Sequence, residues 1–258
     1  MVELEGGCRV IQMFEGSSVT SGTLTSWSQV DRRSGAKAIS LRVLRFAPGM
    51  SPGLRNQSAE EILYFLENLD QLSLMDQVTV YIDGEPFDAE SQSGIYLKPN
   101  QTLNVYNDGP GDAIFVSSRC PEPSDDSHEF TAPLTAPIAK SGTTPIVSLK
   151  ERRALSTADR WYRVLIDDEV GSTQVTQFVG SIPRGRAPDH FHTYEEVLFI
   201  LKGRGRMWGG EKSTEIAPGS CVYLPPRQMH CVENTGDSEL RLLGVFYPAG
   251  SPAVRYES

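Results

Sequence analysis

The sequence predicts an all-β protein in two similar halves, and two observations lead to this fold class. Short apolar runs such as 38–46, 78–82 and 240–247 alternate with Gly, Pro and Asn, whereas sustained helical periodicity is nearly absent. Apolar runs about ten residues apart are typical of an antiparallel sandwich or barrel. Part of the sequence also occurs twice, which indicates two such units in tandem.

The repeat consists of two pairs of similar segments. Residues 52–66 align with 188–201, and each segment carries paired glutamates before an apolar run. Further along the chain, residues 94–109 follow the pattern of 223–236, which ends in a turn of Asn and Gly. Because both pairs keep their order along the chain, each half should form the same kind of barrel.

The repeat also sets the expected domain boundaries. We predict a first barrel over 1–120, a linker over 121–150 and a second barrel over 151–258. The linker begins with Pro, Ser and Asp, a composition suited to a segment on the surface. We interpret His128, which stands alone in it, as a solvated loop residue. Residues 67–77 are longer than the corresponding turn of the second half, so we expect an insertion there.

Three of the four histidines fall in one pattern within the second half. His190 and His192 are two residues apart, Glu196 follows, and His230 comes on a later apolar run. Alternate side chains of a strand share a face, so both early histidines should point the same way, and Glu196 can join them across a turn around Thr193. Imidazole and carboxylate ligands suit divalent transition metals, and this set leaves coordination positions open. We therefore predict a catalytic metal site.

These residues resemble the two motifs of the cupin superfamily. His190, His192, Glu196 and Gly203 match the first motif, and Gly219, Pro225, His230 and Asn234 match the second. The pattern departs at Gly185, which is one residue nearer than the motif asks, and at Arg227, which replaces a glycine. Neither position is a candidate ligand. The resemblance implies tandem double-stranded β-helix (jelly-roll) barrels, which would make the chain a bicupin.

The first half lacks most of the candidate ligands. Counting back from its paired glutamates puts Arg55 and Gln57 where the two histidines should be, and Leu103 takes the third position. Glu61 keeps the position of the motif glutamate. Arginine has no acceptor and leucine cannot ligate a metal. We therefore expect one divalent transition metal per chain (Mn, Fe, Ni, Co, Cu or Zn), held by the second barrel.

Composition limits the partners and the location of the protein. The formal net charge of −9 and the pI near 5.0 argue against nucleic acid or an anionic membrane as a partner. No apolar run approaches the roughly 18 residues that span a bilayer, and the first residues are acidic rather than basic and apolar. We expect a cytoplasmic protein. Because Cys8, Cys120, Cys221 and Cys231 show no paired spacing, we expect buried, reduced thiols.

The resemblance leaves three classes of function open. The three-His, one-Glu set resembles that of quercetinase-like cupin dioxygenases, so our first expectation is a dioxygenase-type oxidoreductase acting on a small organic substrate, with Glu196 as the catalytic proton acceptor. A non-redox metalloenzyme (hydrolase, decarboxylase or isomerase) is the alternative, because oxalate decarboxylases resemble this chain in ligand set and duplication. The third class is a small-molecule-binding cupin without catalysis.

Alternation along residues 196–200 predicts the walls of the site. Leu198 and Ile200 share the parity of Glu196 and should line the interior of the barrel, whereas Val197 and Phe199 should pack outward, which suggests a largely apolar pocket around the metal. The motif also has polar and aromatic neighbours whose roles the sequence leaves open, namely Tyr194, Glu195, Arg206, Trp208, Tyr223, Gln228 and Met229. We interpret Arg206 as a solvated strand charge.

The first half should act as a scaffold for the second. We expect it to cover the sheet of the second half, with Arg55 and Leu103 filling the space where a metal would sit. Residues 78–82 and 240–247 are expected to offer an open sheet edge and an apolar face in the two halves. A small-molecule substrate is the expected partner, and a homodimer is the assembly we consider.

Overall fold

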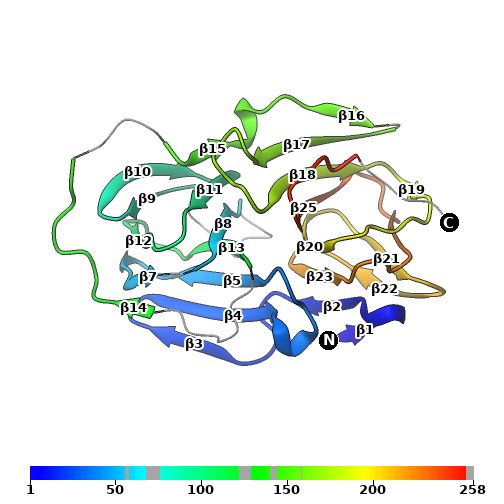
Figure 1. The fold of residues 1–258 in the computed structure, drawn as a ribbon, viewed down its shortest axis with the longest axis horizontal. Helices are drawn as coiled ribbons and strands as arrows, with labels where there is room; N and C mark the ends of the chain where they lie inside the picture. Colours follow the sequence, from blue (N-terminus) through cyan, green and yellow to red (C-terminus); the bar gives the residue numbers. More distant parts are fainter. Residues whose placement is uncertain (56–57, 68–75, 122–128, 140–143, 158, 254–258) are drawn as a thin grey trace.

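The two halves are built almost entirely of β-strands and lie side by side (Figure 1). The computed structural model describes residues 1–55, 58–67, 76–121, 129–139, 144–157 and 159–253. The expected all-β fold in two jelly-roll halves is confirmed. No helix within these residues is long and apolar enough to cross a membrane. Gln57, His128 and most of the expected insertion at 67–77 lie outside the described residues.

The first half consists of a large and a smaller sheet. Its strands are β3 (Ser18–Ser21), β4 (Leu24–Val30), β5 (Leu41–Phe46), β6 (Gly49–Met50), β7 (Gly53–Arg55), β8 (Glu60–Phe65), β9 (Gln77–Ile82), β10 (Glu85–Glu90), β11 (Ser93–Leu97), β12 (Thr102–Asn107), β13 (Ala113–Cys120), β14 (Glu129–Thr131) and β15 (Ile146–Ser148). The large sheet has the order β15-β11-β8-β13-β5-β4-β3, and the smaller one has the order β10-β9-β12-β7-β14, with β6 on β12.

The second half repeats this plan. Its sheets are formed by β1 (Val2–Glu3), β2 (Arg9–Gln12), β16 (Leu155–Thr157), β17 (Arg160–Ile166), β18 (Thr176–Ile182), β19 (Gly185–Arg186), β20 (Glu195–Lys202), β21 (Gly205–Gly209), β22 (Lys212–Ile216), β23 (Ser220–Leu224), β24 (His230–Asn234) and β25 (Leu240–Tyr247). The large sheet has the order β1-β2-β23-β20-β25-β18-β17-β16, and the smaller one β19-β24-β21-β22. Short 3-10 helices occupy Glu5–Gly7, Arg32–Ser34 and Leu149–Glu151.

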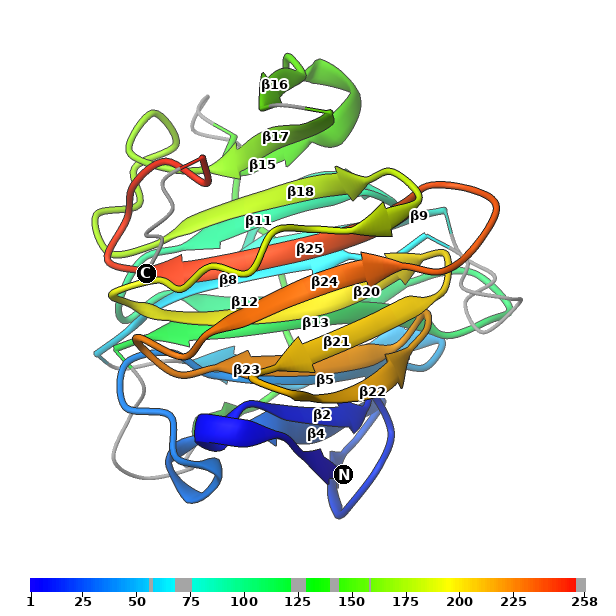
Figure 2. The ribbon, with the colours of Figure 1, turned by 90° about the vertical axis from the view of Figure 1, so that its right-hand side faces the viewer.

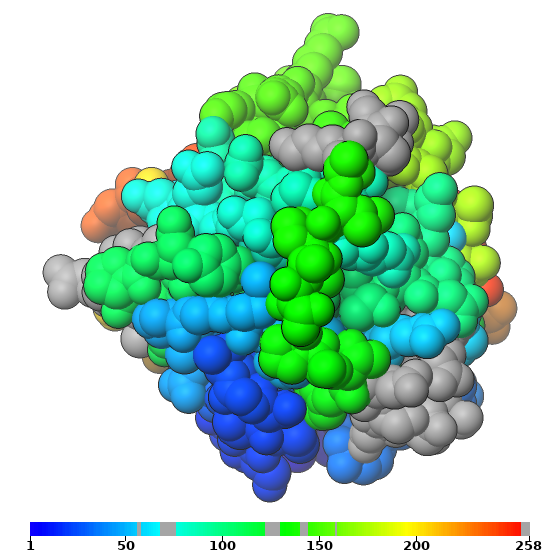
Figure 3. All heavy atoms as spheres, turned by 90° about the vertical axis from the view of Figure 1, so that its left-hand side faces the viewer, coloured from blue at the N-terminus to red at the C-terminus, as the bar shows by residue number. Residues whose placement is uncertain are grey.

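The halves exchange strands at their edges. β2, which precedes the strands of the first half in the chain, pairs with β23 of the second half, and β15, which lies in the predicted linker just before the second half, pairs with β11 of the first half (Figure 1). The division into 1–120, 121–150 and 151–258 remains a prediction. The sheets cross its boundaries, because β2 belongs to a sheet of the second half and β15 to a sheet of the first. Residues 129–139 lie across the outer face of the first half, where β14 pairs with β7 (Figure 3).

The two large sheets pack face to face and share one apolar core. Trp27, Tyr64 and Val116 of the first half belong to the same buried cluster as Val197 and Phe199 of the second. The first half therefore does cover the sheet of the second, as the sequence led us to expect. A strand buried on both faces needs apolar residues at successive positions, and this explains the unbroken apolar run of β20.

The expectation of open edges at 78–82 and 240–247 is wrong. β9 lies between β10 and β12 (Figure 1). β25 lies between β20 and β18 (Figure 2). Both strands are therefore hydrogen-bonded on both sides. β25 is buried on both faces over most of its length, whereas β9 alternates buried and partly exposed residues, and alternation alone cannot distinguish a central strand from an edge strand.

Glu195 fastens the second half to the first. Its buried carboxylate accepts backbone N–H bonds from Lys37 (2.8 Å), Ala38 (2.7 Å) and Ile39 (3.2 Å) of the first half. The Tyr223 hydroxyl adds a bond of 3.2 Å. A carboxylate that receives several N–H groups is a strong acceptor, and its loss would leave buried donors without a partner.

Glu60 makes the reciprocal contact from the first half to the second. Its carboxylate accepts bonds from Thr173 N–H (3.0 Å), the Thr173 hydroxyl (2.7 Å) and Gln174 N–H (3.2 Å), and Ser172 Oγ lies 2.9 Å away. Glu60 precedes Glu61 as Glu195 precedes Glu196, so the repeat is also a repeat of the interface. Burial raises the pKa of Glu60, but the hydrogen bonds outweigh it and hold the pKa below its ordinary value.

Replacing Glu60 by Gln should lower the free energy of unfolding at pH 7 by about 1–3 kcal/mol, because donors buried at the interface lose an ionised acceptor. The lowered pKa means that this stabilisation is complete above about pH 4.3, the unfolded value, and disappears as the pH falls through the folded value. Denaturant unfolding from pH 7 to 3 measures it. Glu215→Gln, at an exposed position, is the control; a constant difference between Glu60→Gln and the wild type across this range would contradict the assignment.

A fragment of residues 151–258 should aggregate, or dimerise through its exposed sheet, and should bind metal poorly. It lacks both the apolar face of the first half and strand β2, and Leu4, Cys8 and Val10 are part of the core of the second barrel. Light scattering after size-exclusion chromatography tests this, and adding residues 1–150 as a separate chain should restore a compact species. A stable monomeric fragment with full metal affinity would refute the scaffold role.

Candidate metal centre

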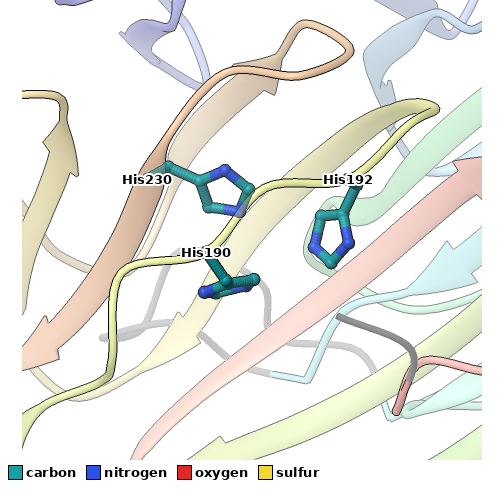
Figure 4. A group of neighbouring side chains, drawn as sticks. All are labelled: His190, His192 and His230. Carbon is teal, nitrogen blue, oxygen red and sulfur yellow. The ribbon is translucent and has the colours of Figure 1, made fainter. Parts of the chain in front are cut away.

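The structure brings the three motif histidines together at the inner side of the second barrel (Figure 4). His190 and His230 face each other in an antiparallel bridge, with N–H···O bonds of 3.1 and 2.9 Å in the two directions. His192 comes two residues later, before β20 begins. One ring nitrogen from each histidine lies within 4.8 Å of the others, a spacing that one metal ion can bridge.

Backbone carbonyls select the tautomers of two of the rings. Nδ1 of His190 is 3.0 Å from the carbonyl oxygen of Pro188, and Nδ1 of His230 is 2.8 Å from that of Gln228. A carbonyl oxygen only accepts, so each Nδ1 carries the proton and each Nε2 keeps its electron pair. Metal-bound imidazoles are commonly oriented by such an outer hydrogen bond. The donor set therefore fits a divalent metal.

Burial keeps His230 neutral. Its side chain is almost fully enclosed, and this burial, together with the charge of His190, lowers the pKa of His230 to about 4. At neutral pH its imidazole is therefore a ready electron-pair donor. Tyr194 stacks on His192 with ring centroids 4.7 Å apart and packs its ring on Phe246 at 4.8 Å, so the plane of His192 is held as well.

Glu196 lies beside the three rings. Its Oε2 is 3.4 Å from Nε2 of His192, although Glu196 is not one of the group whose donor atoms all lie within 4.8 Å. Burial raises the pKa of Glu196 to about 8. Its carboxyl group is therefore mostly protonated at pH 7 in the metal-free chain, and a nearby cation would favour the ionised form. A role as ligand remains a prediction.

A cavity of about 110 Å³ opens on the three histidines and Glu196. Leu198 lines it, as parity predicted, and Ile200 belongs to the same barrel core, whereas Val197 and Phe199 belong to the core between the halves. The remaining wall is mostly apolar or aromatic and includes Tyr162, Phe178, Gly180, Ile182, Ala187, Val232 and Leu242. Such a cavity suits a small organic molecule.

Sequence reasoning missed the wall that β16 and β17 supply. Thr157, Arg160, Trp161 and Tyr162 line the cavity, about thirty residues before the first histidine. No spacing links them to the motif. The signal in the sequence was a short run with two aromatic residues and arginines, which also suits an ordinary edge strand. Pairing of β17 with β18 is what brings it to the site.

Most of the motif's polar neighbours face away from the cavity. Arg206 donates to Ser213 Oγ (2.9 Å), and Trp208 donates to Glu233 (2.8 Å) on the outer face of β21. Tyr223 and Glu195 belong to the interface between the halves, as described above. Among the described residues, none of these four lines the cavity. Gln228 contributes its carbonyl to His230.

The first barrel has an ion pair at the corresponding place. Arg42 Nη2 donates to Glu61 Oε1 (3.0 Å) and to Ser117 Oγ (3.2 Å), and the Ser117 hydroxyl donates to Glu61 (2.6 Å). Both charged side chains are buried. Leu103 packs in the apolar core of this barrel, as expected, whereas the sequence did not reveal Arg42. The four cysteines are buried and free of disulfides, as expected.

Comparisons with known proteins agree with this fold. Residues 178–246 match the model of the cupin domain. A structure of a Bacillus subtilis oxalate decarboxylase variant superposes with a TM-score of 0.74 at 13% identity, covering 94% of this chain and 78% of that one. A second structure of that enzyme, concerned with its Mn(II) centres, gives 0.72 at 14% identity and the same coverage. At this identity the likeness concerns the fold alone.

Relatives in sequence match a shorter stretch. An uncharacterised protein of Methanocaldococcus jannaschii is 39% identical over 57 residues, covering 22% of this chain and 46% of that protein. Glucose-6-phosphate isomerase of Thermococcus litoralis is 40% identical over 68 residues (23% and 35%), and an auxin-binding protein of Nicotiana tabacum is 34% identical over 74 residues (24% and 40%). The chain thus aligns with less than half the length of each of these relatives.

One divalent ion should bind per chain, because the first barrel has Arg55 and Leu103 at the positions of His190 and His230, and its Glu61 is already paired with Arg42. His190→Ala, His192→Ala and His230→Ala should each weaken metal binding by more than the roughly 10- to 100-fold that loss of an outer partner costs. Glu196→Gln should weaken it less, since the amide oxygen can still coordinate. Elemental analysis and competition titrations measure both.

The fourth histidine provides the matched control, and His128→Ala should keep full occupancy. Two ions per chain would contradict the single site, as would full occupancy of the His192→Ala variant.

Proposed function

We propose that this chain, a member of the cupin superfamily, is a metal-dependent enzyme whose small organic substrate binds beside the three-histidine centre of the second barrel. The observation that carries the proposal is the set of His190, His192 and His230, two of them with Nδ1 bonded to carbonyls, at the end of a largely apolar cavity. A bound divalent ion would supply Lewis acidity and a place where substrate and O2 can meet.

Glu196 is the proposed proton acceptor and the fourth ligand. It is buried at the cavity wall beside His192, where burial raises its pKa to about 8 without metal, and a bound cation would favour the ionised form that can accept a proton. The apolar residues around it exclude water, so a proton taken from the substrate stays close to the reacting atoms.

Within this class, we propose a dioxygenase-type oxidoreductase first. Three imidazoles and one carboxylate leave coordination positions open, and the dry cavity suits O2 and a carbon skeleton together. Non-redox chemistry, such as decarboxylation or isomerisation, is the second candidate. The sequence similarity to glucose-6-phosphate isomerases over part of the chain favours it.

Reconstitution with Mn, Fe, Co, Ni, Cu or Zn, followed by assays on small phenols, diketones and carboxylates, tests the function. We expect substrate loss coupled to O2 uptake for at least one metal. Glu196→Gln should lower the turnover rate by roughly 10²- to 10⁴-fold in samples of equal metal content, because the proton acceptor is lost.

Anaerobic assays separate the candidates. Turnover at an unchanged rate without O2 would exclude the dioxygenase and support the non-redox class. Tight substrate binding without turnover under either condition would leave a binding protein and refute the enzyme. Glu215→Gln, an exposed substitution, should leave the rate unchanged.

A further inference from the structure

We propose that the substrate is an organic anion whose charged group binds Arg160, at the far end of the cavity from the histidines, with its apolar skeleton spanning the space between them. This inference rests on the proposed function, because it assigns the substrate class of the same cavity. It concerns β17, which belongs to neither cupin motif.

The strand register places Arg160 well away from the metal centre. Along the inner face of the large sheet, Glu196 is level with Phe246, and Leu198 with Gly244 and Phe178. Tyr162 pairs with Gly180, which lies two residues beyond Phe178 on the same face, and this is one row further from Glu196. Arg160 lies two residues beyond Tyr162 on that face, which is one more row. Successive rows are roughly 7 Å apart along a strand. Arg160 and the histidines nevertheless line one cavity, so a single ligand can reach both.

Arg160 carries the charge at that end. Among the described residues that line the cavity, it is the only arginine or lysine, and its side chain is 14% exposed. Its Nε donates to Asp159 (3.1 Å), whose side chain is 65% exposed, so solvent weakens this pair. A guanidinium group can bind a carboxylate or a phosphate ester through two parallel N–H bonds. Partial burial strengthens such a pair.

Gly180 leaves room between the two ends of the cavity, and apolar side chains line that room. Gly180 lies on the cavity wall, and a Cβ there would meet Phe178 at 3.4 Å and Leu242 at 3.6 Å, which are ordinary contact distances. A Cβ therefore fits at this position, and we expect a larger side chain there to extend into the cavity. Tyr162 and Ile182 flank this position. The ligand should thus have an apolar middle, one polar group for the histidines and one negative charge for Arg160.

The test compares matched anionic and neutral probes on the metal-loaded protein. The probes are ω-hydroxyalkanoates of two to eight carbons, the corresponding amides, and alkyl phosphates of similar length, titrated by calorimetry. Longer anions should bind more tightly than their amides. Arg160→Gln should weaken the binding of these anions roughly 10- to 100-fold, while the affinity for the amides changes little. Arg160→Lys should restore part of the loss. The series that binds more tightly, carboxylates or phosphates, identifies the charged group of the substrate.

Two variants and one short probe locate the effect. Gly180→Val should block the long probes and leave glycolate, which is short enough to bind at the metal alone, unaffected. Arg184→Gln is the control, since Arg184 is exposed and pairs with Asp237 outside the cavity. Metal content, measured on every variant, should stay constant.

The outcomes distinguish this inference from the proposed function. Equal effects of Arg160→Gln on anions and amides, or no effect, would overturn the anion site, even if the protein turned over a neutral substrate. Arg160-dependent anion binding in a protein that proved inactive with every metal would support the anion site and refute the enzyme.

Discussion

The apolar contact between the two large sheets is the constraint on which the rest of the structure depends. It buries one face of β20, including Val197 and Phe199, while the other face of the same strand lines the cavity. Burial of apolar surface is the dominant stabilising effect in folding. A shift of β20 by one residue would turn its buried apolar side chains to the other face, so this burial fixes the register of the strand. The position of Glu196 is therefore a consequence of packing in the other half of the molecule.

Two neighbouring glutamates show how directly the interface and the site are coupled. Glu195 accepts N–H groups from the first half, and Glu196, on the opposite face, lies beside His192. The exchange of β2 and β15 adds backbone pairing to the side-chain contacts. Because the reciprocal residue Glu60 makes the same kind of contact, the scaffold has an approximate two-fold symmetry that the chemistry of the two barrels does not share.

The barrels differ in how a buried carboxylate is compensated. In the first, Glu61 is paired with Arg42 and receives the Ser117 hydroxyl, so its charge is neutralised within the chain. In the second, Glu196 lies beside neutral imidazoles, and burial raises its pKa. A buried carboxylate is stable when it is paired or protonated, and we propose that in the second barrel a metal ion takes the place of the arginine.

The sequence by itself determined the fold class, the duplication, the grouping of His190, His192 and His230, and the absence of their counterparts from the first half. These features depend on alternation and spacing within single segments, which the order of residues records directly. Only the tertiary structure decided the wall that carries Arg160, the Arg42–Glu61 pair, the strand exchange and the central place of β9 and β25. Most of these depend on which strands lie next to one another in a sheet, and the pairing of whole sheets, which no local pattern records, selects such partners.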